Sequence, residues 1–416
     1  MMHIKVRHRL LAMIGNVLEH YDVALFGLLA PFLAPLFFDD KDPLTALILT
    51  YCILPLGVLA RPVGSLFFGW IGDRLGRTRA LFFSLSGMAF ATIGMGCLPT
   101  YAEIGGYAPI LLALGRTVQN FCAAGEIIGG AIFVLEHTDL KKRNLMSSLY
   151  DVSTVVGIML ASFFVTLLSF WGNIEESWRL LFWGGGITAS LGMFLRWRAR
   201  EGREFLQSEK KIRLPLVSVI KEHGGALLAV ICVSGFSYTT YSFAFTLMNG
   251  YVPLVTSVSK TEVMAANTIL LVIDMFLLPL FGYVAARFGR ERLMSVAAIG
   301  AVFSALPVFY LLNGANLAVV IAMRMIIVIM GVAFSASYHA WAQERVEPAV
   351  RYTVLSLGYA LGTQLIGSPT AAASLWMYQK TGWTGAPAIY LMAAAALAAF
   401  MVKRYSVALQ RKSTPV

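Results

Sequence analysis

The chain has 416 residues, of which 58% are hydrophobic and only 13% are charged. Its mean hydropathy is +0.72, and a water-soluble protein of this length needs a charged surface that this composition does not supply. The formal net charge of +11 would suit a nucleic-acid-binding protein, but the basic residues gather in short connections between apolar segments, which argues against that class.

A helix that crosses the bilayer needs about 20 consecutive, mostly apolar residues, and such stretches fill the chain. The first half predicts helices over residues 10–38, 44–70, 78–99, 106–135, 146–170 and 177–197. A polar segment, dense in Arg, Lys and Glu, follows at residues 198–224. We expect it to be a cytoplasmic linker, partly an amphipathic helix on the membrane surface. The second half predicts helices over residues 225–250, 262–286, 292–312, 315–340, 351–376 and 382–403.

We therefore predict an all-α membrane protein with twelve transmembrane helices in two pseudo-symmetric six-helix bundles, residues 1–197 and 225–416. Lys and Arg cluster at every second connection, which places both termini and the linker in the cytoplasm. The first apolar stretch lacks a clear small-residue cleavage site, so we expect a retained helix and not a signal peptide.

The most specific motif is a charged loop after the second predicted helix. It runs from Gly69 to Arg79, and a weaker copy, Gly282 to Arg292, follows the second helix of the second half. The two copies indicate an internal repeat of the six-helix unit. The carboxylate of Asp73 would meet the positive end of the next helix dipole and pair with Arg77. We expect the loop to be a conformational gate formed by Gly69, Asp73, Arg74, Gly76 and Arg77.

Charged side chains inside the predicted helices mark the candidate site, because a charge at the bilayer centre costs on the order of 3 kcal/mol. Glu19 and Asp22 share one face of the first helix. We predict that Glu19, Asp22 and Glu126 carry coupled protons, since partly buried carboxylates can take up and release protons near neutral pH. The predicted substrate-binding residues are Arg116, Gln119, Tyr21, Asp151 and Tyr241.

Structural roles are alternatives at several intramembrane positions. Arg61 could snorkel to the membrane surface, or it could pair with Asp274, which stands at the equivalent position of the second half. Asp151 could be a solvated helix end. His20 and His339 could carry protons, but we favour packing roles for both.

The loop motif matches the one shared across the major facilitator superfamily, and four further regions resemble its metabolite:proton symporter family. These regions are residues 16–27, 61–64, 116–126 and 351–359. The resemblance covers nearly the whole chain and implies proton-coupled carriage of solutes such as proline and betaine, 2-oxoglutarate, citrate or shikimate. The chain departs from the family pattern at His20, where Trp is usual, and at Asn120, where Gly is usual. The C-terminal coiled coil of some osmosensing relatives is missing, so we expect no osmotic activation.

The predicted function is a proton-coupled secondary active transporter, a symporter, that works by alternating access. It would import a small carboxylate-bearing metabolite such as an organic acid, an amino acid or a zwitterionic osmolyte. Arg116 and Arg324 favour a substrate with a carboxylate, while the surplus acids and the aromatic residues are also compatible with a cationic substrate. An exporter of drugs or of a siderophore-like compound is one alternative, and a non-transporting membrane sensor of the same fold is another.

Other classes of function lack the patterns that they would need. We see no nucleophile–base pair, metal-ligand spacing or nucleotide-binding loop, so we expect no enzyme activity, no metal and no cofactor. The four cysteines stand singly in apolar segments, which gives no disulfide framework. The expected partners are a small-molecule substrate, protons and the lipid bilayer, without nucleic acid, and we expect a monomer in the bacterial inner membrane.

Overall fold

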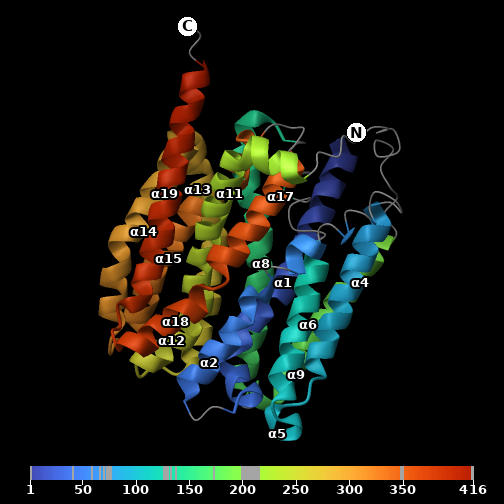
Figure 1. The fold of residues 1–416 in the computed structure, drawn as a ribbon, viewed down its shortest axis with the longest axis vertical. Helices are drawn as coiled ribbons and strands as arrows, with labels where there is room; N and C mark the ends of the chain where they lie inside the picture. Colours follow the sequence, from blue (N-terminus) through green and yellow to red (C-terminus); the bar gives the residue numbers. More distant parts are fainter. Residues whose placement is uncertain are drawn as a thin grey trace.

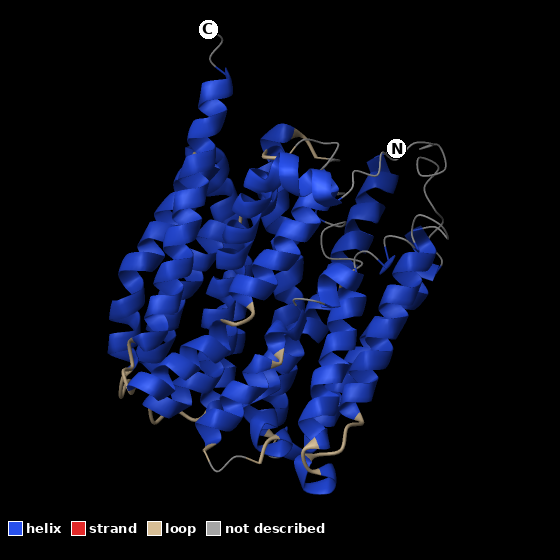
Figure 2. Ribbon diagram, in the orientation of Figure 1, coloured by secondary structure: helices blue, strands red, loops and turns tan. Residues whose placement is uncertain are grey.

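The computed structural model consists almost entirely of α-helices (Figure 2). It describes residues 2–39, 42–57, 60–64, 67–68, 71, 77–124, 131, 134–135, 138–171, 174–197, 216–346 and 351–413. These residues contain no β-strand, which confirms the all-α prediction. A helix satisfies its own backbone hydrogen bonds, and this is what a segment surrounded by lipid requires.

The described helices fall into six segments in each half of the chain, close to the predicted positions. In the first half they are α1 (Met2–Phe37); α2 (Pro43–Cys52) with η1 (Leu54–Leu56); α4 (Arg77–Gly96); α5 (Tyr101–Ile104) with α6 (Tyr107–Ala123); η2 (Leu140–Lys142) with α8 (Arg143–Phe170); and α9 (Ile174–Trp197). In the second half they are α11 (Leu216–Tyr241) with the π-helical η3 (Ser242–Leu247) and α12 (Met248–Val255); α13 (Lys260–Phe288); α14 (Arg290–Leu312); α15 (Leu317–Ser335) with α16 (Tyr338–Glu344); α17 (Arg351–Gly362) with the π-helical η4 (Thr363–Gly367) and α18 (Thr370–Thr381); and α19 (Ala386–Ser413).

Within the described chain, 8 helical stretches are long and apolar enough to cross a membrane. They are residues 13–37, 43–64, 143–170, 222–255, 260–288, 290–312, 317–344 and 386–404. Several helices extend beyond their predicted bounds. The longest extensions are at α1, which begins at Met2, at α11, which begins at Leu216 inside the predicted linker, and at α19, which ends at Ser413. Hydropathy marks only the part of a helix that lies in lipid, whereas the backbone can stay helical into polar residues. The rest of the predicted linker, residues 198–215, lies outside the described residues.

Each half of the chain forms its own hydrophobic core. Buried side chains of α1, α6, α8 and α9 form most of one core, and those of the second half, together with α2, form most of the other. The cores meet at a seam, where Met264 of α13 joins the first core and Tyr51 of α2 joins the second. In Figure 1 the helices α1, α4, α6 and α9 lie on one side and α13, α14, α15 and α19 on the other, with α8, α11 and α17 between them, and both chain termini lie at one end of the molecule. We call this the terminal end and the opposite one the distal end.

Polar contacts join the two halves at the distal end. The carboxylate of Asp42 caps α2 and also accepts a hydrogen bond of 2.8 Å from Gln379 Nε2 of α18. Hydrogen bonds, foremost the one from the Thr45 hydroxyl, hold the pKa of Asp42 below its ordinary value, so the carboxylate is ionised at neutral pH. Lys260 Nζ, at the start of α13, donates to the backbone carbonyl of Pro31 in α1 at 3.1 Å. These contacts link the halves at this end.

The helices α8 and α13 lie against each other along the seam. Toward the distal end the hydroxyl oxygens of Thr166 and Thr268 are 2.9 Å apart. Toward the terminal end a Cβ atom added at Gly282 would lie 2.3 Å from Ser148 Oγ. The absence of a side chain at Gly282 therefore lets the two halves approach closely.

A second close approach joins α1 to α8 within the first half, and it makes a testable prediction. A Cβ added at Gly157 would lie 2.3 Å from the backbone carbonyl oxygen of Val17, and a helix backbone cannot turn away as a flexible side chain can. We expect Gly157→Ala to destabilise the protein by about 1–3 kcal/mol, measured as a lower midpoint of thermal unfolding in detergent. Gly94→Ala is the control, because nothing lies within 4 Å of a Cβ added there. An equal loss in both variants would contradict the close approach.

Candidate functional site

A buried polar cluster lies inside the first half, between α1, α4 and α6. The guanidinium of Arg116 donates to the backbone carbonyl of Val23 at 2.9 Å and to the side-chain oxygen of Gln119. Gln119 Nε2 in turn donates to Thr92 Oγ1 of α4 at 2.9 Å. The guanidinium carbon also lies 5.2 Å from the ring centre of Phe26, within the range of a cation–π contact. The sequence thus fixes the position of one buried positive charge through three helices.

Asp22 of α1 is a buried carboxylate beside this cluster. The side chain is fully buried, and neither carboxylate oxygen has a hydrogen-bond partner among the described residues. The carboxylate fits against α9 because Gly185 has no side chain: a Cβ there would lie 2.3 Å from Asp22 Oδ1. Arg116 supplies an attractive positive charge. A buried carboxylate without hydrogen bonds is costly when ionised, so this position suits a group that gains and loses a proton.

The second half holds its buried arginine in a similar way. Arg324 of α15 donates to the backbone carbonyl of Ala244 in η3 at 2.7 Å and to the side-chain oxygen of Asn267. Asn267 Nδ2 donates across the seam to Ser162 Oγ of α8 at 3.0 Å. Each of the two arginines therefore bonds a carbonyl in the first membrane helix of its own half. The contacts of Arg324 brace α15 against η3, α13 and, through Asn267, α8.

A narrow crevice in the second half contains a buried acid and two aromatic rings. It is lined by Thr240, Tyr241, Ala244, Phe245, Asp274, Ile327, Val328, Gly331 and Val332. Asp274 Oδ1 accepts a hydrogen bond of 3.3 Å from the Tyr241 hydroxyl, and Oδ2 has no partner among the described residues. The rings of Tyr241 and Phe245 are 5.6 Å apart. A carboxylate beside aromatic rings is the chemistry that attracts an ammonium group.

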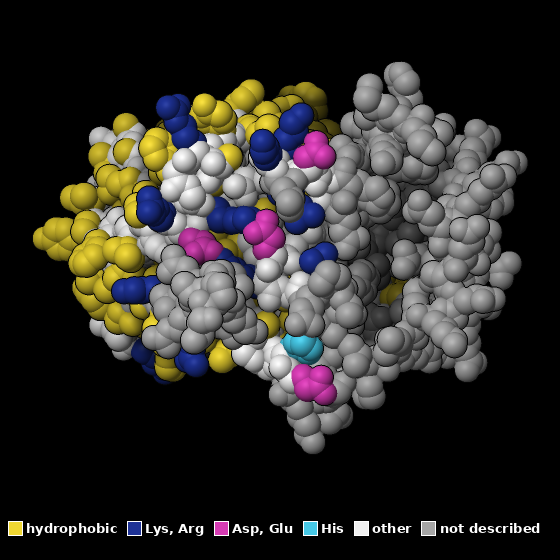
Figure 3. Space-filling view, turned by 90° about the horizontal axis from the view of Figure 1, so that it is seen from above, with side chains coloured by type: hydrophobic (Ala, Val, Ile, Leu, Met, Phe, Trp, Pro, Cys, Tyr) yellow, Lys and Arg dark blue, Asp and Glu magenta, His cyan; other side chains and the backbone are white. Residues whose placement is uncertain are grey.

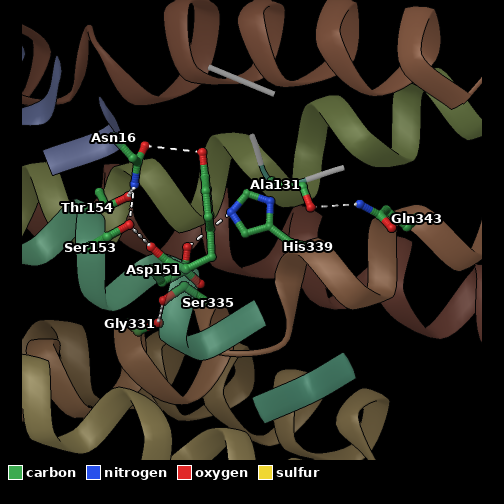
Figure 4. A network of polar contacts seen from close by, with 10 residues as sticks. Asn16, Ala131, Asp151, Ser153, Thr154, Gly331, Ser335, His339 and Gln343 are labelled. Atoms are coloured by element: carbon green, nitrogen blue, oxygen red, sulfur yellow. Dashed lines mark hydrogen bonds and ion pairs between the residues drawn. The ribbon is translucent and has the colours of Figure 1, made fainter. Parts of the chain in front are cut away.

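Asp151 of α8 and His339 of α16 meet at the seam between the halves (Figure 4). His339 Nε2 lies 3.0 Å from Asp151 Oδ1, and the two side chains are only 14% and 15% exposed. The interpretation of Asp151 as a solvated helix end is therefore wrong. A packing role alone does not describe His339 either, because its ring contacts a carboxylate of the other half as well as the edge of Tyr150.

Comparison with known proteins identifies the kind of molecule that holds these groups. A family model described as "Sugar (and other) transporter" matches residues 9–221, about half of the chain. The chain belongs to the sugar (and other) transporter family. The proline/betaine transporter of Salmonella typhimurium (strain LT2) is 28% identical over 403 residues, which are 93% of this chain and 80% of that protein. The glycine betaine/proline/ectoine/pipecolic acid transporter of Dickeya dadantii is 28% identical over 408 residues, with 93% and 80% covered.

Solved structures show the fold of this transporter. The crystal structure of a D-xylose–proton symporter matches with a TM-score of 0.77 at 16% identity, over 95% of this chain and 97% of that one. A partially occluded, inward open structure of the xylose transporter from E. coli gives a TM-score of 0.73 at 17% identity, over 95% and 96%. The chain is thus a multi-pass membrane transporter with the twelve-helix major facilitator fold, and it is not an enzyme. The family recognised from the motifs is confirmed.

The structure places the predicted substrate-binding residues in two groups. Arg116 and Gln119 lie together in the first half, where the hydroxyl of Tyr21 donates to the backbone carbonyl of Leu181 at 3.3 Å. Asp151 lies at the seam and Tyr241 lines the crevice of the second half. Of the predicted proton carriers, Asp22 and Glu19 are buried in α1. Glu126 and the gate residues Gly69, Asp73, Arg74 and Gly76 lie outside the described residues, and Arg77 is described only as the first residue of α4.

The possible pair between Arg61 and Asp274 is not formed. Arg61 Nε donates to Asn120 Oδ1 at 3.1 Å, while Asp274 accepts from Tyr241. Sequence reasoning also missed two residues of these networks. Thr92 accepts a hydrogen bond from Gln119, and Asn16 donates hydrogen bonds to α8. Both are uncharged residues in apolar helices, where a single polar side chain gives no signal of its own.

Proposed function

We propose that this transporter is a proton-coupled symporter that imports a small zwitterionic solute, an amino acid or a betaine, by alternating access. The observation that supports the proposal most is Asp22, a fully buried carboxylate that has no hydrogen-bond partner among the described residues and is attracted by Arg116. Protonation would remove the cost of the buried negative charge and free Arg116 to bind a second carboxylate. Proton binding and substrate binding at this cluster would then depend on each other.

The distribution of charge and the names of the relatives support a zwitterionic substrate. The two relatives above are named for proline and betaine, which join a carboxylate to a positively charged nitrogen. In this chain the carboxylate would bind Arg116, Gln119 and Tyr21, since guanidinium groups bind carboxylates with charge-assisted hydrogen bonds. The nitrogen would lie toward Asp151 and Tyr241, where acids and aromatic rings gather.

The remaining parts of the cycle are proposed from the sequence. Asp22 would be the main proton carrier, with Glu19 and Glu126 as further carriers. The gate residues Gly69, Asp73, Arg74, Gly76 and Arg77 would hold the cytoplasmic side closed in the outward-facing form. Residues 1–197 and 225–416 would rock as two units, joined by the linker at 198–224.

We also propose that the terminal end faces the cytoplasm. Figure 3 shows that end, with Lys and Arg side chains gathered over its described part. Exposed basic residues there include Lys141, Lys142, Arg287 and Arg292, whereas the distal end exposes the acids Asp39, Asp42, Glu175 and Glu176. This is the asymmetry of the positive-inside rule. We place the transporter in a bacterial inner membrane, as a monomer.

Uptake into proteoliposomes tests the proposed function. Labelled proline, glycine betaine, 2-oxoglutarate and citrate would each be offered with and without an imposed gradient that makes the lumen alkaline. We expect the gradient to drive accumulation of proline or glycine betaine, and a protonophore to abolish it. Accumulation of the dicarboxylate or tricarboxylate alone would contradict the zwitterionic substrate. No uptake by a correctly folded protein would favour an exporter or a sensor.

A further inference from the structure

The Asp151–His339 pair joins the two halves of the molecule, and each of its residues is held by contacts within its own half. On the first half, Asn16 of α1 donates to Ser153 Oγ and Thr154 Oγ1 of α8, at 2.8 Å each (Figure 4). These bonds fix the turn of α8 that carries Asp151 against α1. On the second half His339 belongs to α16, which continues the line of the buried helix α15. The pair therefore links two bodies that alternating access must separate.

The position of the pair shows which end of the molecule it closes. Asp151 lies about 12 Å from the start of α8 at Arg143, and His339 about 8 Å from the end of α16 at Glu344, by the rise of an α-helix. Glu344 forms an ion pair with Arg290 at the start of α14, and we assign this end of α16 and the start of α8 to the terminal end. A second bond across the halves lies nearby, from Gln343 Nε2 to the backbone carbonyl of Ala131 at 3.4 Å. The terminal end cannot open along this seam while these contacts remain.

The two contacts differ in one respect that matters for coupling. The bond from Gln343 is between uncharged groups and is the same at every pH. The pair of Asp151 with His339 is an ion pair only while the imidazole is protonated and the carboxylate is ionised. Aromatic rings hold the imidazole in place, with Tyr150 at 5.5 Å and 88° and Tyr338 at 5.0 Å and 65°.

Other titratable groups face the pair from the surrounding helices. They are Tyr150 from α8, Tyr338 from α16, Tyr359 from α17, Tyr241 from α11, Asp274 from α13 and His20 from α1. The charged residue of α15, Arg324, is roughly 20 Å away along its helix.

We propose that Asp151 and His339 form a proton-sensitive latch that holds the terminal ends of the two halves together, in addition to the loop gate. Protonation of the Asp151 carboxylate or loss of the imidazole proton weakens the latch and favours opening at that end. The latch adds a second proton-dependent step to the proposed coupling. This step lies at the interface between the halves and is separate from Asp22. The role of the latch in transport rests on the proposed function, but the latch itself does not, since opening can be measured without substrate.

A distance measurement between spin labels tests the latch. The labels would replace Lys141 and Arg292, exposed residues at the terminal end of the first and second half, after the exposed Cys52 and Cys97 are changed to serine. Without substrate, we expect His339→Gln to raise the ratio of open to closed molecules by about five- to tenfold, a common size for coupling within proteins. The ratio should depend on pH in the native protein, because the pair can lose its charges, and this dependence should be lost in the variant.

Three further variants decide the outcome. Gln343→Ala removes the uncharged bond and should leave the pH dependence intact. His20→Gln should also leave it intact, because the latch does not include that ring. The exchanged pair, Asp151→His with His339→Asp, should restore the closed state and the pH dependence, which a loss of folding could not do. The proposal is overturned if His339→Gln opens no further than the native protein at any pH, or if the exchanged pair stays as open as the single variant. Neither result would depend on whether uptake is proton-coupled.

Discussion

Asp22→Asn is expected to abolish accumulation of substrate against its gradient, while exchange of labelled for unlabelled substrate continues. An asparagine has the shape of the protonated acid but cannot release a proton, so it mimics one state of the cycle permanently. A driving force of 100 mV is worth about 2.3 kcal/mol per charge, which corresponds to roughly fiftyfold accumulation. The variant should lose this whole factor and reach only equal concentrations inside and outside.

Asp39→Asn is the matched control for that experiment. It makes the same chemical change at an exposed acid near the distal end of α1, so it should accumulate substrate as the native protein does. Accumulation by Asp22→Asn at the native level, with the control unchanged, would remove Asp22 from the coupling mechanism. The proton would then have to be carried by Glu19, by Glu126 or by the Asp151–His339 pair at the seam.

Arg116→Ala is expected to lower the affinity for substrate by about a hundredfold. Charge-assisted hydrogen bonds contribute about 1.5–3 kcal/mol each, and every 1.4 kcal/mol is tenfold in binding. The loss should be specific to the carboxylate of the substrate. The native protein should bind glycine betaine far more tightly than choline, which lacks the carboxylate, and the variant should bind both equally weakly in competition measurements.

Arg324→Ala is the informative comparison, because the structure gives this second buried arginine backbone and amide partners. We expect it to lower the yield of folded protein and the midpoint of unfolding, while the folded fraction keeps its preference for glycine betaine over choline. A loss of that preference in Arg324→Ala, with Arg116→Ala unaffected, would mean that the substrate carboxylate binds in the second half.

The helices of this fold follow from the sequence, because lipid requires long apolar stretches whose backbone bonds are satisfied internally. The same reasoning located Asp22 and Arg116, since a charge in lipid is too costly to be accidental. The helix ends were less predictable. Hydropathy places the start of the seventh membrane segment at residue 225, but nothing between Leu216 and that residue breaks a helix, so α11 begins earlier. The π-helical turns at Ser242 and Thr363 were not predicted, because they depend on packing and not on local composition.

Pairing across the molecule could not be predicted from one sequence. Asp151 and His339 are 188 positions apart, and only the meeting of α8 with α16 brings them together. The equivalent positions of Arg61 and Asp274 in the two halves suggested a pair that the structure does not form, because each residue has a nearer polar neighbour. In sequence Arg116 and Arg324 both favoured a carboxylate-bearing substrate, yet Asp22 beside Arg116 has no counterpart among the contacts of Arg324.

The movement of protons with substrate tests the central proposal most directly. Proteoliposomes with a pH-sensitive dye inside, a clamped membrane potential and no initial pH gradient would receive proline or glycine betaine outside. Proton-coupled import predicts that the lumen acidifies as substrate enters, that the signal is absent without substrate, and that Asp22→Asn eliminates it. Entry of labelled substrate without any acidification would contradict proton symport and leave a transporter that works by facilitated diffusion or with another ion.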